Sequence, residues 1–130
     1  MREMTAPREG SRSELNRQAI GIGTFLKERK ARDVVVLDLE GLTSITDYFI
    51  ICTVTSSIQA KAIIRDLEMF MSQYDLRPLS RDAALDSPWV LVDYNYFIIH
   101  IFQKDGREYY RLEKLWSDAK ILYSDTGGMP

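Results

Sequence analysis

Paired carboxylates are the first feature of this sequence that could perform chemistry. Asp38 and Glu40 follow the short apolar run 34–37, and alternate residues of a strand point to the same side. Such a pair can hold magnesium for nucleotide chemistry, although a working site normally adds a third carboxylate and a glycine-rich phosphate loop. The segment 55–57 could bind an anion at a helix start, but no glycine accompanies it. A nucleotide-binding or nucleotidyltransferase-type enzyme that uses Asp38 and Glu40 is therefore the alternative hypothesis.

The single histidine and the single cysteine favour structural roles. His100 lies between Ile98 and Phe102 in an apolar run. It could act as a general base held by Asp93, but no catalytic motif surrounds it, and a packed, hydrogen-bonded imidazole is favoured. Cys52 lies in a second apolar run and is expected in the core. One histidine and one cysteine exclude a two-histidine metal cluster and a multi-cysteine zinc site, so we predict no catalytic residue, no metal and no cofactor.

Length and composition indicate one globular domain. The chain has 130 residues, of which 45% are hydrophobic and 28% charged, and these values are ordinary for a single folded domain. No apolar run approaches the roughly 18 residues that a membrane span needs. We therefore expect no membrane association.

Charge is distributed unevenly along the chain. Residues 1–32 contain eight Lys and Arg against four Asp and Glu, whereas residues 33–130 contain nine against fifteen. An acidic body does not suit phosphate backbones, which need clustered Lys and Arg, so no direct DNA binding is expected. Complementary potentials steer protein encounters, and the acidic body therefore favours a basic protein partner.

Periodicity predicts a mixed α/β fold. Apolar residues at three- and four-residue steps indicate helices, and β-branched runs indicate strands. Ser56 and Gln59 form a capping-box signature, and a strand–helix–strand crossover makes the sheet partly parallel. We expect a small mixed sheet of about four to five strands flanked by helices, in one domain over residues 12–123 with flexible tails at 1–11 and 124–130. The predicted elements are helix 11–30, strands 34–37 and 48–54, a helix from Ser56 to Tyr74, strands 89–94 and 97–102, and a helix capped by Asp105 that runs to about Tyr123.

The predicted hairpin has a second face that is unusually apolar. A two-residue turn at 95–96 places Tyr94 opposite Phe97 on a core face. A solvent-facing sheet surface is normally polar, so either a helix covers the other face or part of it binds a partner. That other face carries Trp89, Leu91 and Asp93 against Phe102, His100 and Ile98.

The last predicted helix adds an aromatic candidate. Tyr110 lies about a third of a turn from the inward stripe, beside Lys114 and Ser117. Tyr and Trp are enriched at binding hot spots, so Tyr110 is a candidate contact residue. The inward stripe itself is predicted to be Tyr109, Leu112, Trp116 and Ala119.

Three collinear segments resemble one known family. They are RDVVVLDLEGLTSITDYFIICTVTSS, WVLVDYNYFIIHIF and GREYYRLEKLWSDA, and together they resemble the Iojap-related ribosomal silencing factor S family from about Asp33 to Ala119. The most specific pieces are the aspartate–hydrophobic stretch ending in TSS, the WVLVDY strand and the Y-x-L-E-x-L-W helix. Two departures are Val54, where the family usually has glycine, and Asn95-Tyr96, where Gly-Asp is common.

The resemblance implies a nucleotidyltransferase-like fold without catalytic residues or cofactor. Members of the family bind the large ribosomal subunit through ribosomal protein L fourteen, block association with the small subunit and repress translation. Members of the family occur in bacteria, mitochondria and chloroplasts. The N-terminal stretch is Arg-rich but contains Glu3, Glu9 and Glu14, which makes it a poor transit peptide, so we expect the bacterial cytoplasm rather than a mitochondrion or plastid. The resemblance also allows a homodimer.

The family's partner-binding positions fall on four residues of this sequence. Periodicity independently selects Trp89, Asp93 and Tyr110, whereas it places Tyr94 on the core face. The partner-binding residues implied by the resemblance are Trp89, Asp93, Tyr94 and Tyr110.

Overall fold

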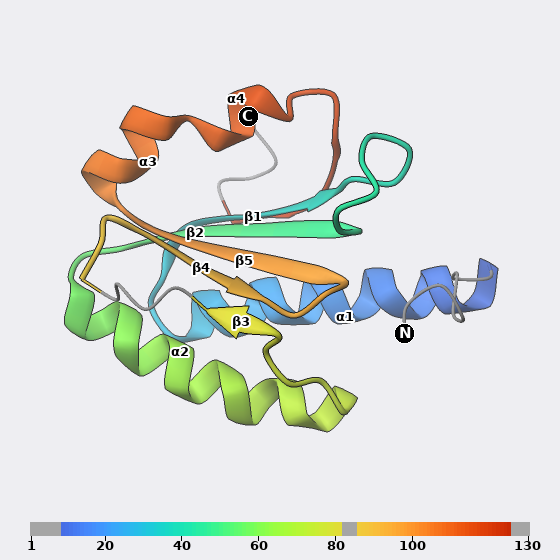
Figure 1. The fold of residues 1–130 in the computed structure, drawn as a ribbon, viewed down its shortest axis with the longest axis horizontal. Coiled ribbons are helices and arrows are strands. Elements are labelled where there is room, and N and C mark those ends of the chain that lie inside the picture. Colours follow the sequence, from blue (N-terminus) through green and yellow to red (C-terminus); the bar gives the residue numbers. More distant parts are fainter. Residues whose placement is uncertain (1–8, 82–85, 126–130) are drawn as a thin grey trace.

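A mixed β-sheet with helices on both faces forms the domain (Figure 1). The computed structural model describes residues 9–81 and 86–125. Within them the sheet has the strand order β3-β4-β5-β2-β1-β6. The elements are α1 (Glu9–Glu28), β1 (Arg32–Asp38), β2 (Tyr48–Val54), α2 (Ser57–Met71), the 3₁₀ helix η2 (Ser72–Tyr74), β3 (Ser80–Arg81), β4 (Trp89–Asp93), β5 (Phe97–Gln103), α3 (Lys104–Tyr110), α4 (Leu112–Leu115) and β6 (Lys120–Ser124).

The predicted fold class is confirmed, and the sheet is partly parallel as expected. β2 and β5 pair in parallel, and the other neighbours pair antiparallel. Within the described residues, five of the strands are five to seven residues long, and the sixth, β3, has two residues. The hairpin register is confirmed throughout, because Trp89 lies opposite Phe102 and Asp93 opposite Ile98.

Two apolar clusters hold the sheet between its helices. The larger cluster lies between the sheet and helices α1 and α2, and the smaller one lies on the face of α3 and α4 (Figure 1). Gly23 brings α1 close to β1, because a Cβ there would lie 2.7 Å from Val36 Cγ2. The central strand β2 is buried along its whole length, which explains its unbroken apolar sequence.

The capping signature of α2 is confirmed with one difference. Ser56 is the N-cap, and its hydroxyl accepts a hydrogen bond from Gln59 N at 3.1 Å. The Gln59 side chain, however, accepts from Thr55 N at 2.8 Å rather than from the N-cap residue itself. Both bonds satisfy backbone donors near the helix start.

The predicted last helix is wrong beyond Tyr110. Arg111 takes a left-handed backbone with φ of 49°, which ends α3, and after the short α4 the chain returns as β6 beside β1. The N-cap is Gln103, not Asp105. The predicted inward position of Tyr109 is wrong, because this residue of α3 is 80% exposed, whereas Leu112 is 7% exposed as expected.

The first and last elements of the structure extend a few residues beyond the predicted domain 12–123. Helix α1 begins at Glu9, within the predicted tail 1–11, and residues 1–8 lie outside the described part. At the other end, Ser124 belongs to β6, and the Asp125 carboxylate accepts a hydrogen bond from Val34 N at 3.0 Å. Residues 126–130 lie outside the described part.

Candidate functional site

The outward face of β4 is a half-buried strip of alternating residues. Trp89, Leu91 and Asp93 are each partly exposed, and the intervening Val90 and Val92 are buried. Behind the strip, every β5 residue from Phe97 to Phe102 is buried. This alternation follows from the two-residue period of a strand that has one face on the core.

Helix α3 brings a second aromatic group onto this strip. Because α3 follows β5 directly, Tyr110 lies against Trp89 with ring centroids 4.5 Å apart, and Trp89 also stacks on Phe102 at 5.2 Å. Tyr110 is 42% exposed, and its ring centroid lies 5.0 Å from that of the more exposed Tyr109. We call Trp89, Leu91, Tyr109 and Tyr110 the aromatic surface.

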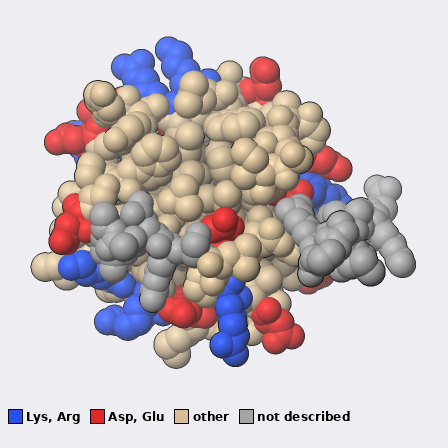
Figure 2. Space-filling view, in the orientation of Figure 1, with Lys and Arg blue, Asp and Glu red and all other residues tan. Residues whose placement is uncertain are grey.

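Figure 2 shows the charge distribution on the side of the molecule seen in Figure 1. A broad area without Lys, Arg, Asp or Glu occupies the middle and upper part of this view, and charged side chains lie around its edge. Depletion of charged residues is one compositional feature of the core of a macromolecular interface.

The four residues implied by the resemblance do not form one cluster. Trp89 and Tyr110 are in contact. Asp93 lies at the other end of β4, where its Oδ1 accepts a hydrogen bond from Asn95 N at 2.7 Å and supports the turn. Tyr94 is 1% exposed and belongs to the larger apolar cluster, so periodicity placed it correctly on the core face.

His100 is packed and hydrogen-bonded, as predicted. It is 2% exposed, and its Nδ1 lies 3.0 Å from Trp89 Nε1, which donates the hydrogen bond. Burial lowers the pKa of His100 to about 3, because the charged imidazolium is disfavoured away from water. The imidazole is therefore neutral at physiological pH.

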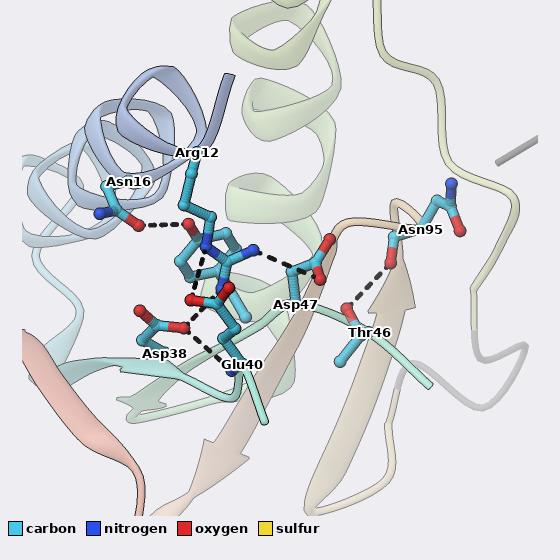
Figure 3. Close-up of polar contacts among 8 residues, drawn as sticks. Arg12, Asn16, Asp38, Glu40, Thr46, Asp47 and Asn95 are labelled. Carbon is cyan, nitrogen blue, oxygen red and sulfur yellow. Dashed lines mark hydrogen bonds and ion pairs between the residues drawn. The ribbon is translucent and has the colours of Figure 1, made fainter. Parts of the chain in front are cut away.

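The carboxylates of Asp38 and Glu40 face an arginine rather than an open metal site (Figure 3). Arg12, from α1, lies 2.7 Å from Asp38 Oδ1, 3.3 Å from Glu40 Oε1 and 3.5 Å from Asp47 Oδ1. Its guanidinium also lies 5.0 Å from the Tyr48 ring centroid, and Tyr48 donates a hydrogen bond to Asn16. Desolvation by itself lowers the pKa of Arg12, but the electrostatic interactions with Tyr48 and the three carboxylates together outweigh it, so that the pKa is raised.

The remaining candidates of the sequence have structural roles. Cys52 is buried, and burial raises the pKa of its thiol to about 12, so the reactive thiolate is disfavoured. Ser56 caps α2. Among the described residues, no group of three or more His, Cys, Asp or Glu side chains could hold a metal ion.

A cavity beside α4 was not expected from the sequence. It has a volume of about 590 Å³, and its apolar lining residues include Val35, Leu37 and Trp116. Arg107 lines it and is held by Glu113 at 2.7 Å and by Thr53 Oγ1 at 2.8 Å. The cavity depends on the chain break at Arg111 and on β6, and neither feature has a periodic signal in the sequence.

Fold and site define a small mixed α/β domain that presents an exposed aromatic surface. The family model described as "Ribosomal silencing factor during starvation" matches residues 12–128. The chain belongs to this family, which confirms the resemblance. In the described part of the chain, no helix is both long and apolar enough to cross a bilayer.

Relatives come from bacteria and organelles. The ribosomal silencing factor RsfS of Bacillus subtilis is 37% identical over 100 residues, which are 77% of this chain and 85% of that protein. The chloroplastic protein Iojap of Zea mays is 31% identical over 101 residues, 78% of this chain and 44% of that protein. A mouse protein named for mitochondrial assembly of the ribosomal large subunit is 31% identical over 97 residues, 72% of this chain and 42% of that protein.

The fold also matches a solved structure. A crystal structure of a Chromobacterium violaceum protein superposes with a TM-score of 0.69 at 28% identity, covering 81% of this chain and 85% of that one.

Proposed function

We propose that this protein binds the large ribosomal subunit through ribosomal protein L fourteen and so blocks association with the small subunit. The block is steric, because a protein seated on the joining face occupies the volume that the small subunit needs. Translation is repressed without any covalent step, cofactor or metal. The proposed location is the bacterial cytoplasm, where its target ribosomes lie.

The names of the relatives support the ribosomal part of the proposal. The family and its Bacillus subtilis member are named as ribosomal silencing factors and not as enzymes. The mouse relative is named for the large subunit. A chain that is similar to both along most of its length is expected to share the large subunit as its target.

The contact between Trp89 and Tyr110 is the observation that carries the proposal. The two rings lie 4.5 Å apart on a partly exposed face. Aromatic side chains of this kind bury a large area and lose little conformational entropy on binding. We infer that Trp89 and Tyr110 anchor the partner, that Asp93 acts at the edge of the interface, and that Tyr94 supports the hairpin from the core.

Charge supports a protein partner rather than bare RNA. Residues 33–130 carry nine Lys and Arg against fifteen Asp and Glu. Binding to phosphates requires clustered positive charge, whereas a domain with an excess of acidic residues is complementary to a basic ribosomal protein. This argues for contact through a protein of the subunit.

A second copy of the chain is a further partner that we propose for the same surface. The aromatic surface would be covered equally well in a homodimer, since apolar patches of this kind commonly pair. A dimer of this form would compete with subunit binding. Raising the protein concentration would then lower the fraction of protein molecules that are bound to large subunits.

Co-sedimentation with isolated ribosomal subunits tests the proposal. We expect the wild-type protein to pellet with large subunits only, and to reduce the yield of joined ribosomes when small subunits are added. Trp89→Ala and Tyr110→Ala each remove an anchor. We expect each to weaken binding to large subunits by about 2 kcal/mol, or about 30-fold in affinity. The circular dichroism spectrum should stay native.

Ile58→Ala is the matched control for these variants. Ile58 is 77% exposed on α2, on the opposite face of the sheet, so its truncation removes similar apolar area away from the aromatic surface. Wild-type binding to small subunits, or equal binding by all three variants, would contradict the proposal.

A further inference from the structure

His100 is a buried polar side chain directly behind the aromatic surface. It lies in the middle of β5, paired with Leu91 on β4 and with Ile51 on β2, and it is 2% exposed. The other five residues of β5 between Phe97 and Phe102 are apolar. The proposed partner contact does not require His100 to touch anything outside the domain.

The hydrogen bond between His100 and Trp89 has one allowed direction. An indole N–H can only donate, so His100 Nδ1, 3.0 Å away, must be the acceptor. The proton of the neutral imidazole is therefore on Nε2, which is buried and has no hydrogen-bond partner among the residues that the structure describes. His100 thus provides an acceptor for Trp89 and leaves its own donor buried, an arrangement that does not maximise stability.

The acceptor is held in place from the core side. The His100 ring packs edge-to-face against Phe49 with centroids 4.4 Å apart, and Phe49 packs in the same way against Trp116 at 5.5 Å. Trp89, in contrast, lies at the edge of the domain, where it stacks on Phe102 and packs against the tilted ring of Tyr110. Stacked rings can slide over one another, whereas a hydrogen bond to a fixed nitrogen selects one orientation.

We propose that His100 is a positioning residue that fixes the orientation of the Trp89 indole in the aromatic surface. The inference rests on the proposed function for its consequence, because a Trp89 ring that is already ordered loses less freedom when the partner binds. Immobilising one side chain on binding lowers the affinity about 2- to 10-fold, and a Trp89 ring that is already ordered avoids this loss. His100 therefore contributes to binding without contact with the partner.

A catalytic role for His100 has no support from its neighbours. The diagonal candidate Asp93 lies opposite Ile98, and its Oδ1 accepts a hydrogen bond from Asn95 N. The acceptor nitrogen of His100 is occupied by Trp89. A role of His100 in positioning Trp89, in contrast, agrees with both hydrogen bonds.

Three substitutions separate positioning from simple packing. His100→Phe keeps a planar ring in the strand and removes the acceptor. His100→Asn returns an acceptor, since Oδ1 occupies a position similar to Nδ1. Ile99→Val is the matched control, because Ile99 is a neighbour on the same strand that is fully buried in the larger cluster on the opposite face.

Two measurements are made on the full-length protein. Hydrogen exchange of the Trp89 indole N–H, followed by ¹H–¹⁵N NMR with Trp116 as internal reference, reports the hydrogen bond directly. The dissociation constant for isolated large subunits reports the consequence. We expect His100→Phe to accelerate exchange at Trp89 only and to weaken binding about 2- to 10-fold, with partial recovery of both in His100→Asn and no change in Ile99→Val.

Other outcomes overturn the inference. Unchanged Trp89 exchange in His100→Phe means that stacking alone orders the indole. Equal loss of binding in Ile99→Val means that affinity follows stability. If His100→Phe does not fold, His100→Leu replaces it as the variant without an acceptor.

The same experiment separates this inference from the proposed function. If the wild-type protein does not bind large subunits, the proposed function fails, and the Trp89 exchange rate alone decides whether His100 positions the indole.

Discussion

Asp38 shows how one distant residue changes the chemistry of a carboxylate. Its spacing from Glu40 matches a metal-binding pair, but Arg12 approaches Asp38 to 2.7 Å and also faces Glu40 and Asp47. A permanently charged guanidinium supplies the positive charge that a metal would otherwise bring. The pair is thus part of an ion-pair cluster that joins α1 to the sheet.

Because His100 is buried in its neutral form, we expect the domain to lose stability in acid. Its pKa falls from 6.5 to about 3 on folding because it is buried. Between these two values the unfolded chain binds a proton that the folded chain does not bind. The free energy of unfolding should therefore decrease as pH falls through this window, by up to about 1.4 kcal/mol per pH unit.

Urea unfolding at about pH 7 and about pH 4.5 measures this effect. The carboxylates titrate alike in the wild type and in His100→Phe, so the difference between the two proteins isolates the histidine. We expect the wild type to lose about 2.5 kcal/mol more than the variant. Parallel losses in both proteins would show that His100 becomes protonated in the folded state.

At the scale of elements, the packing of α1 on β1 outweighs helix propensity. Gly23 faces Val36 at a distance that leaves no room for a Cβ, whereas a Cβ at Gly21 would meet only the Tyr74 hydroxyl at 3.0 Å. Alanine in place of glycine favours a helix by about 1 kcal/mol. Overpacking a filled core costs about 1–3 kcal/mol.

Gly23→Ala should therefore be less stable than Gly21→Ala. We expect Gly23→Ala to destabilise the domain by about 1 kcal/mol and Gly21→Ala to be neutral or stabilising. Chemical denaturation of both variants measures the difference. Equal stabilisation by the two substitutions would show that β1 moves away without cost.

The hairpin of β4 and β5 is the element whose local pattern predicted most of the candidate site. Alternation placed Trp89, Leu91 and Asp93 on one face and Tyr94 on the other, and the register is as expected. The contribution of α3 was less predictable. Its end at Arg111 depends on a left-handed backbone, and within α3 Tyr109 is exposed whereas Tyr110 lies against Trp89.

At the scale of the whole molecule, the acidic body should steer association. Exposed charges are screened over about 10 Å at 0.1 M salt and about 3 Å at 1 M. Added salt should therefore slow association with large subunits severalfold and leave the dissociation rate nearly constant, because the aromatic contacts are apolar. Surface-immobilised large subunits allow both rates to be measured. A salt effect on dissociation alone would indicate that charge pairs lie at the centre of the interface.

The sequence by itself determined the order of the central elements, the hairpin register, the cap of α2 and the family. These properties depend on local spacing, since strand and helix periods and capping residues act within a few positions. It also identified Trp89 and Tyr110 as candidates, because large aromatics outside the expected core stripes are visible in a pattern.

Tertiary structure alone decided which of these residues meet. The contact of Trp89 with Tyr110, the hydrogen bond from Trp89 to His100, the cluster around Arg12 and the pairing of β6 with β1 join residues between 11 and 89 positions apart. Such pairs leave no periodic trace in a single sequence, because they depend on where whole elements pack. The same physical reason explains why β6 was expected as helix: its apolar residues fit either period until β1 offers an unpaired edge.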